Sequence, residues 1–144
     1  MKLSVNYIAI LVSGIASMAI GFIWYMPSVF GNMWMRAVGA DPNDKARIKE
    51  MQKSMGPMYA IMFVLTLVSA YVMARFINVL GFTHIEQACK LALALWAGFM
   101  FPVSTADAIF GNRSKNSIWT IVWMNGLHNL VVQLAVAAII FYWR

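Results

Sequence analysis

The chain has 144 residues, of which 62% are hydrophobic and 11% are charged, and its mean hydropathy is +0.71. A soluble domain carries about 45–50% apolar and about 25% charged residues, so this composition excludes a water-soluble globular protein. The formal net charge is +6. Because the basic residues gather between apolar runs and no nucleic-acid-binding motif is present, the expected partners are the lipid bilayer and its anionic headgroups, with no nucleic acid.

Four apolar runs are each long enough to form a spanning helix, which needs about 20 residues. They cover residues 3–26, 58–80, 85–110 and 118–143. Pro27 closes the first run, Gly81 the second and Gly111 the third. The runs are continuously apolar, whereas the strands of a membrane barrel alternate. The sequence therefore predicts an all-α membrane protein, a single domain with four transmembrane helices in a bundle.

The first loop, residues 27–57, is predicted to contain a short amphipathic helix on the membrane surface. Asp41 followed by Pro42 is typical of a helix start, and Gly56 is typical of a stop. Apolar residues share one face of this segment and lysines lie mostly on the other: Ile48, Met51 and Met55 against Lys45, Lys49 and Lys53. A solvated loop helix is the alternative.

Basic residues in short loops predict the orientation, because they accumulate on the cytoplasmic side. The first and third loops contain seven of them: Arg36, Lys45, Arg47, Lys49, Lys53, Arg113 and Lys115. The opposite side has four: Lys2, Arg75, Lys90 and Arg144. This bias predicts that loops one and three lie in the cytoplasm and that both termini lie outside.

Polar side chains within a span are costly and usually face protein or water. The fourth span has Asn125, His128, Asn129 and Gln133 at positions i, i+3, i+4 and i+8, within an arc of roughly 140°. This face is either the wall of a conduit or polar pocket, in which a histidine titrates near neutral pH, or a set of hydrogen bonds that holds the bundle together.

The third span adds Ser104 and Asp107, which are predicted to flank that polar face. Asp107 lies close to the end of its span. Its carboxyl group is either a proton carrier or the partner of a cation such as Arg113, Arg75 or His128.

Small residues repeat every four positions along the first span: Ala9, Ser13, Ser17 and Gly21. This pattern lets helices approach closely, either within the chain or between chains. Cys89 is the single cysteine, so an intrachain disulfide is excluded. The sequence has no phosphate-binding loop, nucleophile elbow or metal-ligand spacing, and it predicts no catalytic residue, cofactor or metal.

Two stretches carry a resemblance to a known family. One reads GFIWYMP at residues 21–27 and continues with Phe-Gly and Trp-Met at 30–31 and 34–35; the other reads AIFGNRS at 108–114. They resemble a family of small four-span bacterial membrane proteins catalogued as a domain of unknown function. The resemblance covers nearly the whole chain and implies four helices and a bacterial inner membrane. It implies no activity and no functional residues.

Three functions stay open at this point. The first is a small transporter or channel lined by the polar face. Because four helices enclose little volume, such a conduit is expected to be a homo-oligomer with closed symmetry. The second is a structural or accessory membrane protein that packs with a partner and neither transports nor catalyses. The third is a membrane enzyme that acts on a lipid near Asp107 or His128.

Overall fold

The structure is a computed structural model and describes residues 4–111 and 115–143. The described residues contain no strand, and four of their helical stretches are long and apolar enough to cross a membrane: Tyr7–Trp24, Gly56–Val79, Ile85–Phe110 and Ser117–Tyr142. The predicted class, an all-α protein of four apolar helices, is therefore confirmed. Several residues of the sequence predictions lie outside the described residues: Lys2, Leu3, residues 112–114 and Arg144.

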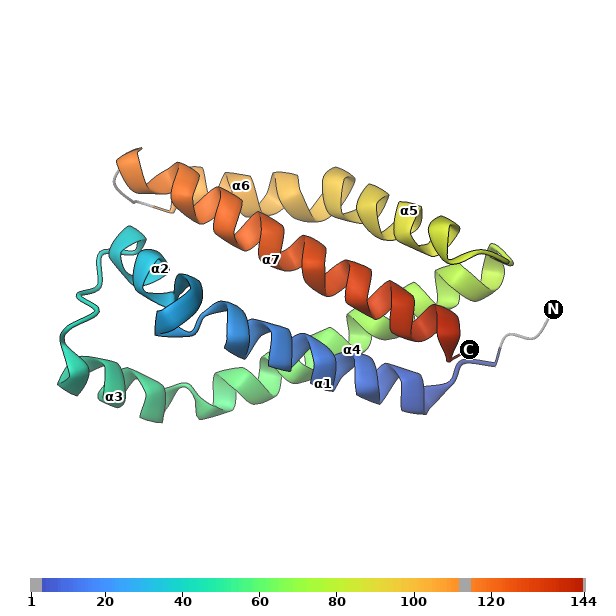
Figure 1. The fold of residues 1–144 in the computed structure, drawn as a ribbon, viewed down its shortest axis with the longest axis horizontal. Coiled ribbons are helices and arrows are strands. Elements are labelled where there is room, and N and C mark those ends of the chain that lie inside the picture. Colours follow the sequence, from blue (N-terminus) through green and yellow to red (C-terminus); the bar gives the residue numbers. More distant parts are fainter. Residues whose placement is uncertain (1–3, 112–114, 144) are drawn as a thin grey trace.

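The chain forms seven α-helices and two wide π-helical turns within the described ranges. In chain order they are α1 (Tyr7–Trp24), η1 (Pro27–Gly31), α2 (Asn32–Ala37), α3 (Lys45–Ser54), α4 (Gly56–Val79), α5 (Ile85–Leu95), η2 (Trp96–Met100), α6 (Phe101–Phe110) and α7 (Lys115–Tyr142). The start of α1 and the end of α7 lie at one end of the bundle, and α2 and α3 lie at the other (Figure 1).

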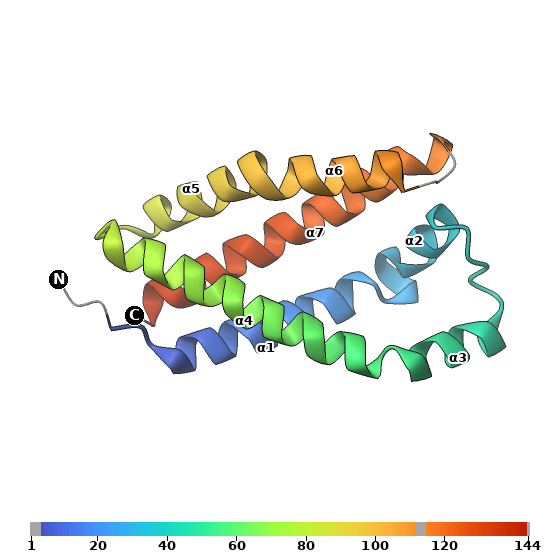
Figure 2. The ribbon, with the colours of Figure 1, turned by 180° about the vertical axis from the view of Figure 1, so that it is seen from behind.

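The last helix, α7, is the centre of the arrangement. It contacts α1, α2, α4, α5 and α6. In two opposite views, α5 and α6 run along one side of α7, and α1 and α4 cross on the other (Figures 1 and 2). With 28 residues, α7 is about 42 Å long. It therefore exceeds the roughly 30 Å hydrocarbon core of a bilayer.

Local sequence explains where the spanning helices begin and end. The Asn6 side chain accepts hydrogen bonds from the amides of Ile8 (3.0 Å) and Ala9 (3.3 Å), which caps α1. Gly81 follows α4 with φ +62°, a left-handed conformation that glycine adopts without steric cost. The Gln87 side chain accepts from the His84 amide at 3.1 Å and fixes the first turn of α5.

The first span does not simply end at Pro27. α1 ends at Trp24, and after a short break at Tyr25 and Met26 the helix resumes with Pro27 as its first residue. Proline suits the first helical position because the amide that it lacks would have no helical partner there. Through η1 and α2 the chain then continues beside α7.

The helix in the first loop begins three residues later than predicted. Asp44 caps α3 by accepting from the Arg47 amide at 3.1 Å. The Asp41 side chain instead accepts from the Asn43 amide at 2.8 Å and closes a turn, so Pro42 lies in that turn and not in the helix. α3 leads into α4 at the end of the bundle where α2 lies (Figures 1 and 2).

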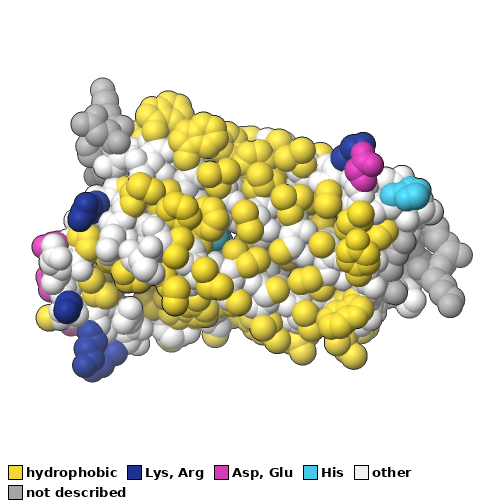
Figure 3. All heavy atoms as spheres, in the orientation of Figure 1, with side chains coloured by type: hydrophobic (Ala, Val, Ile, Leu, Met, Phe, Trp, Pro, Cys, Tyr) yellow, Lys and Arg dark blue, Asp and Glu magenta, His cyan; other side chains and the backbone are white. Residues whose placement is uncertain are grey.

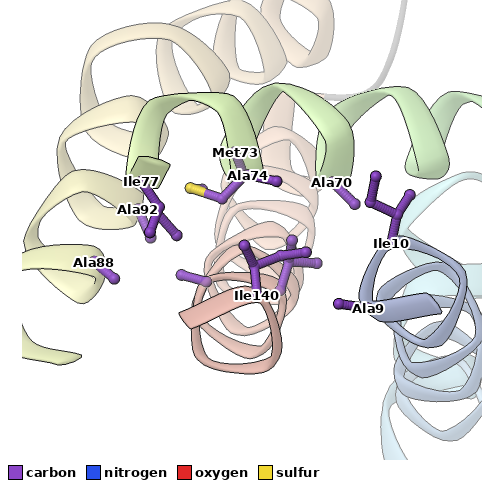
Figure 4. Close-up of a cluster of buried hydrophobic side chains, with 11 residues drawn as sticks. Ala9, Ile10, Ala70, Met73, Ala74, Ile77, Ala88, Ala92 and Ile140 are labelled. Carbon is purple, nitrogen blue, oxygen red and sulfur yellow. The ribbon is translucent and has the colours of Figure 1, made fainter. Parts of the chain in front are cut away.

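The main apolar core lies where α4, α5, α7 and α1 meet. It is built largely from small residues together with Met73, Ile77 and Ile140. Figure 4 shows α4 side chains directed toward α7 and α1, with Ala88 and Ala92 of α5 completing the layer. Lipid cannot drive helices together as water does, so close contact through small residues is the means by which these helices associate.

Most of the outer surface is apolar. On the face in Figure 3, hydrophobic side chains cover the middle of the molecule, and the charged side chains gather at its two ends. Large exposed residues include Phe99 (70%), Val103 (62%) and Phe110 (86%) on the η2 and α6 side. A surface of this kind is stable only in a bilayer, which supplies its apolar solvent.

Candidate functional site

The polar residues of α7 face the interior of the molecule. Gln133 is buried, with 7% of its surface exposed, and Asn125, His128 and Asn129 are half-buried. The predicted arc therefore lies against neighbouring helices. The structure brings these four residues together with side chains of α1, α4 and the break after α1.

Asn125 and His128 contact the end of the first span. The Tyr25 hydroxyl donates to Asn125 Oδ1 at 2.9 Å. The His128 ring packs against two aromatic rings, with centroid distances of 5.3 Å to Tyr25 and 5.9 Å to Trp24. The break in the first span thus places two consecutive aromatic side chains against the middle of α7.

His128 has one partnered and one unpartnered ring nitrogen. Its Nδ1 lies 3.3 Å from Asn129 Oδ1. With the ring proton on Nδ1, this contact is a hydrogen bond to the carboxamide oxygen, and Nε2 is then an acceptor. Nε2 is buried and has no hydrogen-bond partner among the described residues. A Cβ atom at Gly21 would lie 3.5 Å from it, so α1 approaches the ring closely at this glycine.

Two further buried polar atoms have no hydrogen-bond partner within the described ranges: Trp24 Nε1 and Thr105 Oγ1. The indole nitrogen is a donor only. The Trp24 and His128 rings therefore present a free donor and a free acceptor from adjoining side chains. Burying such a group without a partner costs roughly 1–3 kcal/mol judged from protein mutations.

Gln133 forms its hydrogen bond with a different helix, α4. Its Nε2 donates to the Ser69 hydroxyl of α4 at 3.3 Å. This bond joins α7 to α4, so Gln133 is a packing residue as well as a member of the polar face.

The third span contributes less than the sequence predicts. Ser104 is half-buried, and its hydroxyl donates to the Phe101 carbonyl of its own helix at 3.1 Å. The Asp107 side chain is exposed, and the structure gives it no ion pair with a described residue. Of the cations considered as alternative partners for it, Arg113 lies outside the described residues, and neither Arg75 nor His128 pairs with it.

The small-residue stripe of α1 lies inside the chain. Ala9 (1% exposed), Ser13 (0%) and Ser17 (7%) are buried, and Gly21 faces His128. The hydroxyl groups of Ser13 and Ser17 donate to the carbonyls four residues earlier, each at 2.7 Å. They need no other partner, so this stripe serves close packing.

Sequence reasoning overlooked Trp24 and Tyr25 as members of the site. Both lie near the end of a predicted span, where tryptophan and tyrosine are typical of interfacial anchors. The one signal in the sequence was the position of Pro27, which fits the start of a new helical segment as well as the end of an old one.

This fold and site define a multi-pass α-helical membrane protein with a polar face on its fourth span. The family model described as "Protein of unknown function (DUF1761)" matches residues 8–141. The chain therefore belongs to that family, as the resemblance predicted. No curated protein matches the chain. No solved structure matches it either.

Proposed function

We propose that this protein is a small transporter or channel, in which a polar solute or water reaches His128 between α1 and α7. One observation carries the proposal: His128 Nε2 is buried near the middle of a span with no partner among the described residues. In lipid an unsatisfied polar group is expensive. Intramembrane polar groups of this kind usually line a cavity or a substrate path.

The chemistry around His128 indicates the kind of solute. Nε2 needs a donor and Trp24 Nε1 needs an acceptor. A water molecule or a hydroxyl group provides both. The break after α1 supports the same reading, because interrupted helices at membrane depth recur at the substrate sites of transporters.

We further propose that the protein works as a homo-oligomer in a bacterial inner membrane, with the first and third loops in the cytoplasm. We infer the oligomer because α7 occupies the centre of the bundle, and the helices of one copy therefore leave little room for a path between them. The orientation follows from the charge bias of the loops, and the bacterial membrane from the family resemblance.

Cysteine accessibility tests the conduit. Starting from Cys89→Ser, single cysteines replace Asn125 or Asn129, and Leu127→Cys serves as the matched control because that apolar residue is 44% exposed. Membranes are treated with a small, membrane-impermeant thiol reagent. We expect rapid labelling at 125 and 129 and slow labelling at 127. Labelling at 125 and 129 that is as slow as at the control position 127 would contradict a water-filled path.

A structural or accessory role is the second candidate, and the first half of α4 favours it. Ile61 (54% exposed), Val64 (57%) and Leu65 (55%) leave this part of the helix open on several sides. Another membrane helix could pack there. No observation favours a lipid-modifying enzyme to the same degree.

Oxidative crosslinking of Ile61→Cys in membranes separates these roles. A product of twice the chain mass supports the homo-oligomer, and a product with a different protein supports an accessory role. Val103→Cys on α6, with Val103 62% exposed, controls for random collision. Equal crosslinking of the two variants would remove α4 as a specific contact.

A further inference from the structure

A second polar region lies at the α2 end of the bundle. A cavity of about 520 Å³ opens there between η1, α2 and the first turns of α7. This volume is in the range of small-molecule sites, roughly 300–1,000 Å³. Its principal lining residues are Val29, Asn32, Met33, Arg36, Ser117 and Thr120.

We propose that this cavity binds the phosphate group of an acidic phospholipid, with Arg36 as its charged contact. Arg36 is exposed and forms no ion pair with a described residue. Its guanidinium group offers several N–H donors in a planar array that matches phosphate oxygens. None of the described lining residues carries a carboxylate that would compete for it.

Neutral hydrogen-bonding groups complete the polar wall. Asn32 on α2 carries an amide, and Ser117 and Thr120 on α7 carry hydroxyl groups. These side chains can donate to the oxygens of a phosphate without adding charge. They come from two segments that are about 85 positions apart in the sequence, and only the packing of α2 on α7 brings them together.

Two apolar side chains in the same wall point to a lipid as the source of the phosphate. Val29 and Met33 are 46% and 47% exposed, and water is a poor solvent for both. Two lining residues adjoin tryptophans in the sequence: Met33 precedes Trp34, and Thr120 follows Trp119. Tryptophan is typical of the headgroup level of a membrane. An acyl chain would cover Val29 and Met33 while its headgroup meets Arg36.

The same geometry predicts selectivity for acidic lipids. A zwitterionic headgroup such as phosphocholine would bring its own cation toward Arg36. An acidic headgroup would not. A basic side chain near a membrane surface contributes about 1 kcal/mol toward anionic lipid, which corresponds to roughly fivefold in binding. The site does not depend on the conduit at His128, so either proposal can fail alone.

Native mass spectrometry of the full-length chain tests this site. Protein is taken from nanodiscs of equal phosphatidylglycerol and phosphatidylcholine, and the retained lipids are identified. We expect a preference for phosphatidylglycerol that Arg36→Gln lowers about fivefold. Arg47→Gln, which removes the same charge from exposed α3 outside the cavity, should lower the preference less. The double variant Ser117→Ala, Thr120→Val should lower it with the net charge intact.

Competition with excess inorganic phosphate identifies the source. Retention of phosphatidylglycerol supports a lipid site, and its displacement supports a site for the phosphate group alone. Equal losses in Arg36→Gln and Arg47→Gln, or no preference in the unaltered chain, would overturn the proposal. Thermal unfolding checks each variant. If Arg36→Gln does not fold, the double variant at Ser117 and Thr120 decides the result.

Discussion

Around His128, satisfied and unsatisfied polar groups lie side by side. Asn125 accepts from Tyr25 and Asn129 engages His128 Nδ1, which is the pattern of bonds that hold a bundle together. His128 Nε2 and Trp24 Nε1 break that pattern among the described residues. A purely structural network gains nothing by leaving a donor and an acceptor unpaired. This mixture is the residue-level reason to expect a ligand or water here.

The close approach at Gly31 gives a prediction at the same scale. A Cβ there would collide with the Tyr25 carbonyl oxygen, and backbone atoms cannot swing aside as a flexible side chain can. We therefore expect Gly31→Ala to lower the free energy of unfolding by about 1–3 kcal/mol. Unfolding of the purified protein in mixed micelles, followed by circular dichroism, measures the change.

Gly98→Ala is the control for that experiment. Nothing lies within 4 Å of a Cβ at Gly98, and alanine is the better helix former by up to about 1 kcal/mol. The two variants should thus shift stability in opposite directions. A stable Gly31→Ala protein would mean that the break after α1 can open at little cost.

At the scale of the helices, the bond between Gln133 and Ser69 links α7 to α4. We expect Ser69→Ala and Gln133→Leu to be coupled by about 0.6 kcal/mol in a double-mutant cycle, the average for hydrogen bonds between membrane helices. Stability measured in micelles for both single variants and the double variant gives this coupling. Purely additive effects would show that the 3.3 Å contact contributes no net stability.

The sequence predicted the spanning helices well because their signals are physically strong. Continuous apolar runs of the right length have few alternatives in a chain of this composition, and Gly81 ends α4 through its left-handed backbone. Helix starts were less certain. Asp41 and Asp44 are both good caps, and only the turn closed by Asp41 decides that Asp44 begins α3.

From the sequence, only the α7 residues of the candidate site could be predicted. Helical periodicity identified the polar face of α7, since that calculation needs a single helix. It could not identify Trp24, Tyr25 or Ser69 as its partners, because partners depend on how the helices pack. For Asp107 the sequence left a proton carrier and an ion pair open for the same reason, and the structure gives it no ion pair with a described residue.

For the molecule as a whole, orientation is the clearest open prediction. The first loop places most of its basic side chains at the α2 and α3 end, while α1 begins and α7 ends at the opposite end (Figures 1 and 3). We expect Lys49→Cys to react with an impermeant reagent only in inverted vesicles. Thr83→Cys, at the turn between α4 and α5, should react only in right-side-out vesicles. The reverse pattern would invert the proposed topology.

The central position of α7 has a consequence for how the protein is made. α7 is the last of the four spans to leave the ribosome, and domains form in the order of synthesis. Among the described residues of the first three spans, α1 and α4 already pack on each other, whereas α5 and α6 have α7 as their principal helical neighbour. The Ser69 hydroxyl of α4 also lacks its partner Gln133 until α7 arrives. We therefore expect α1 and α4 to associate first and the third span to join the bundle when α7 enters the membrane.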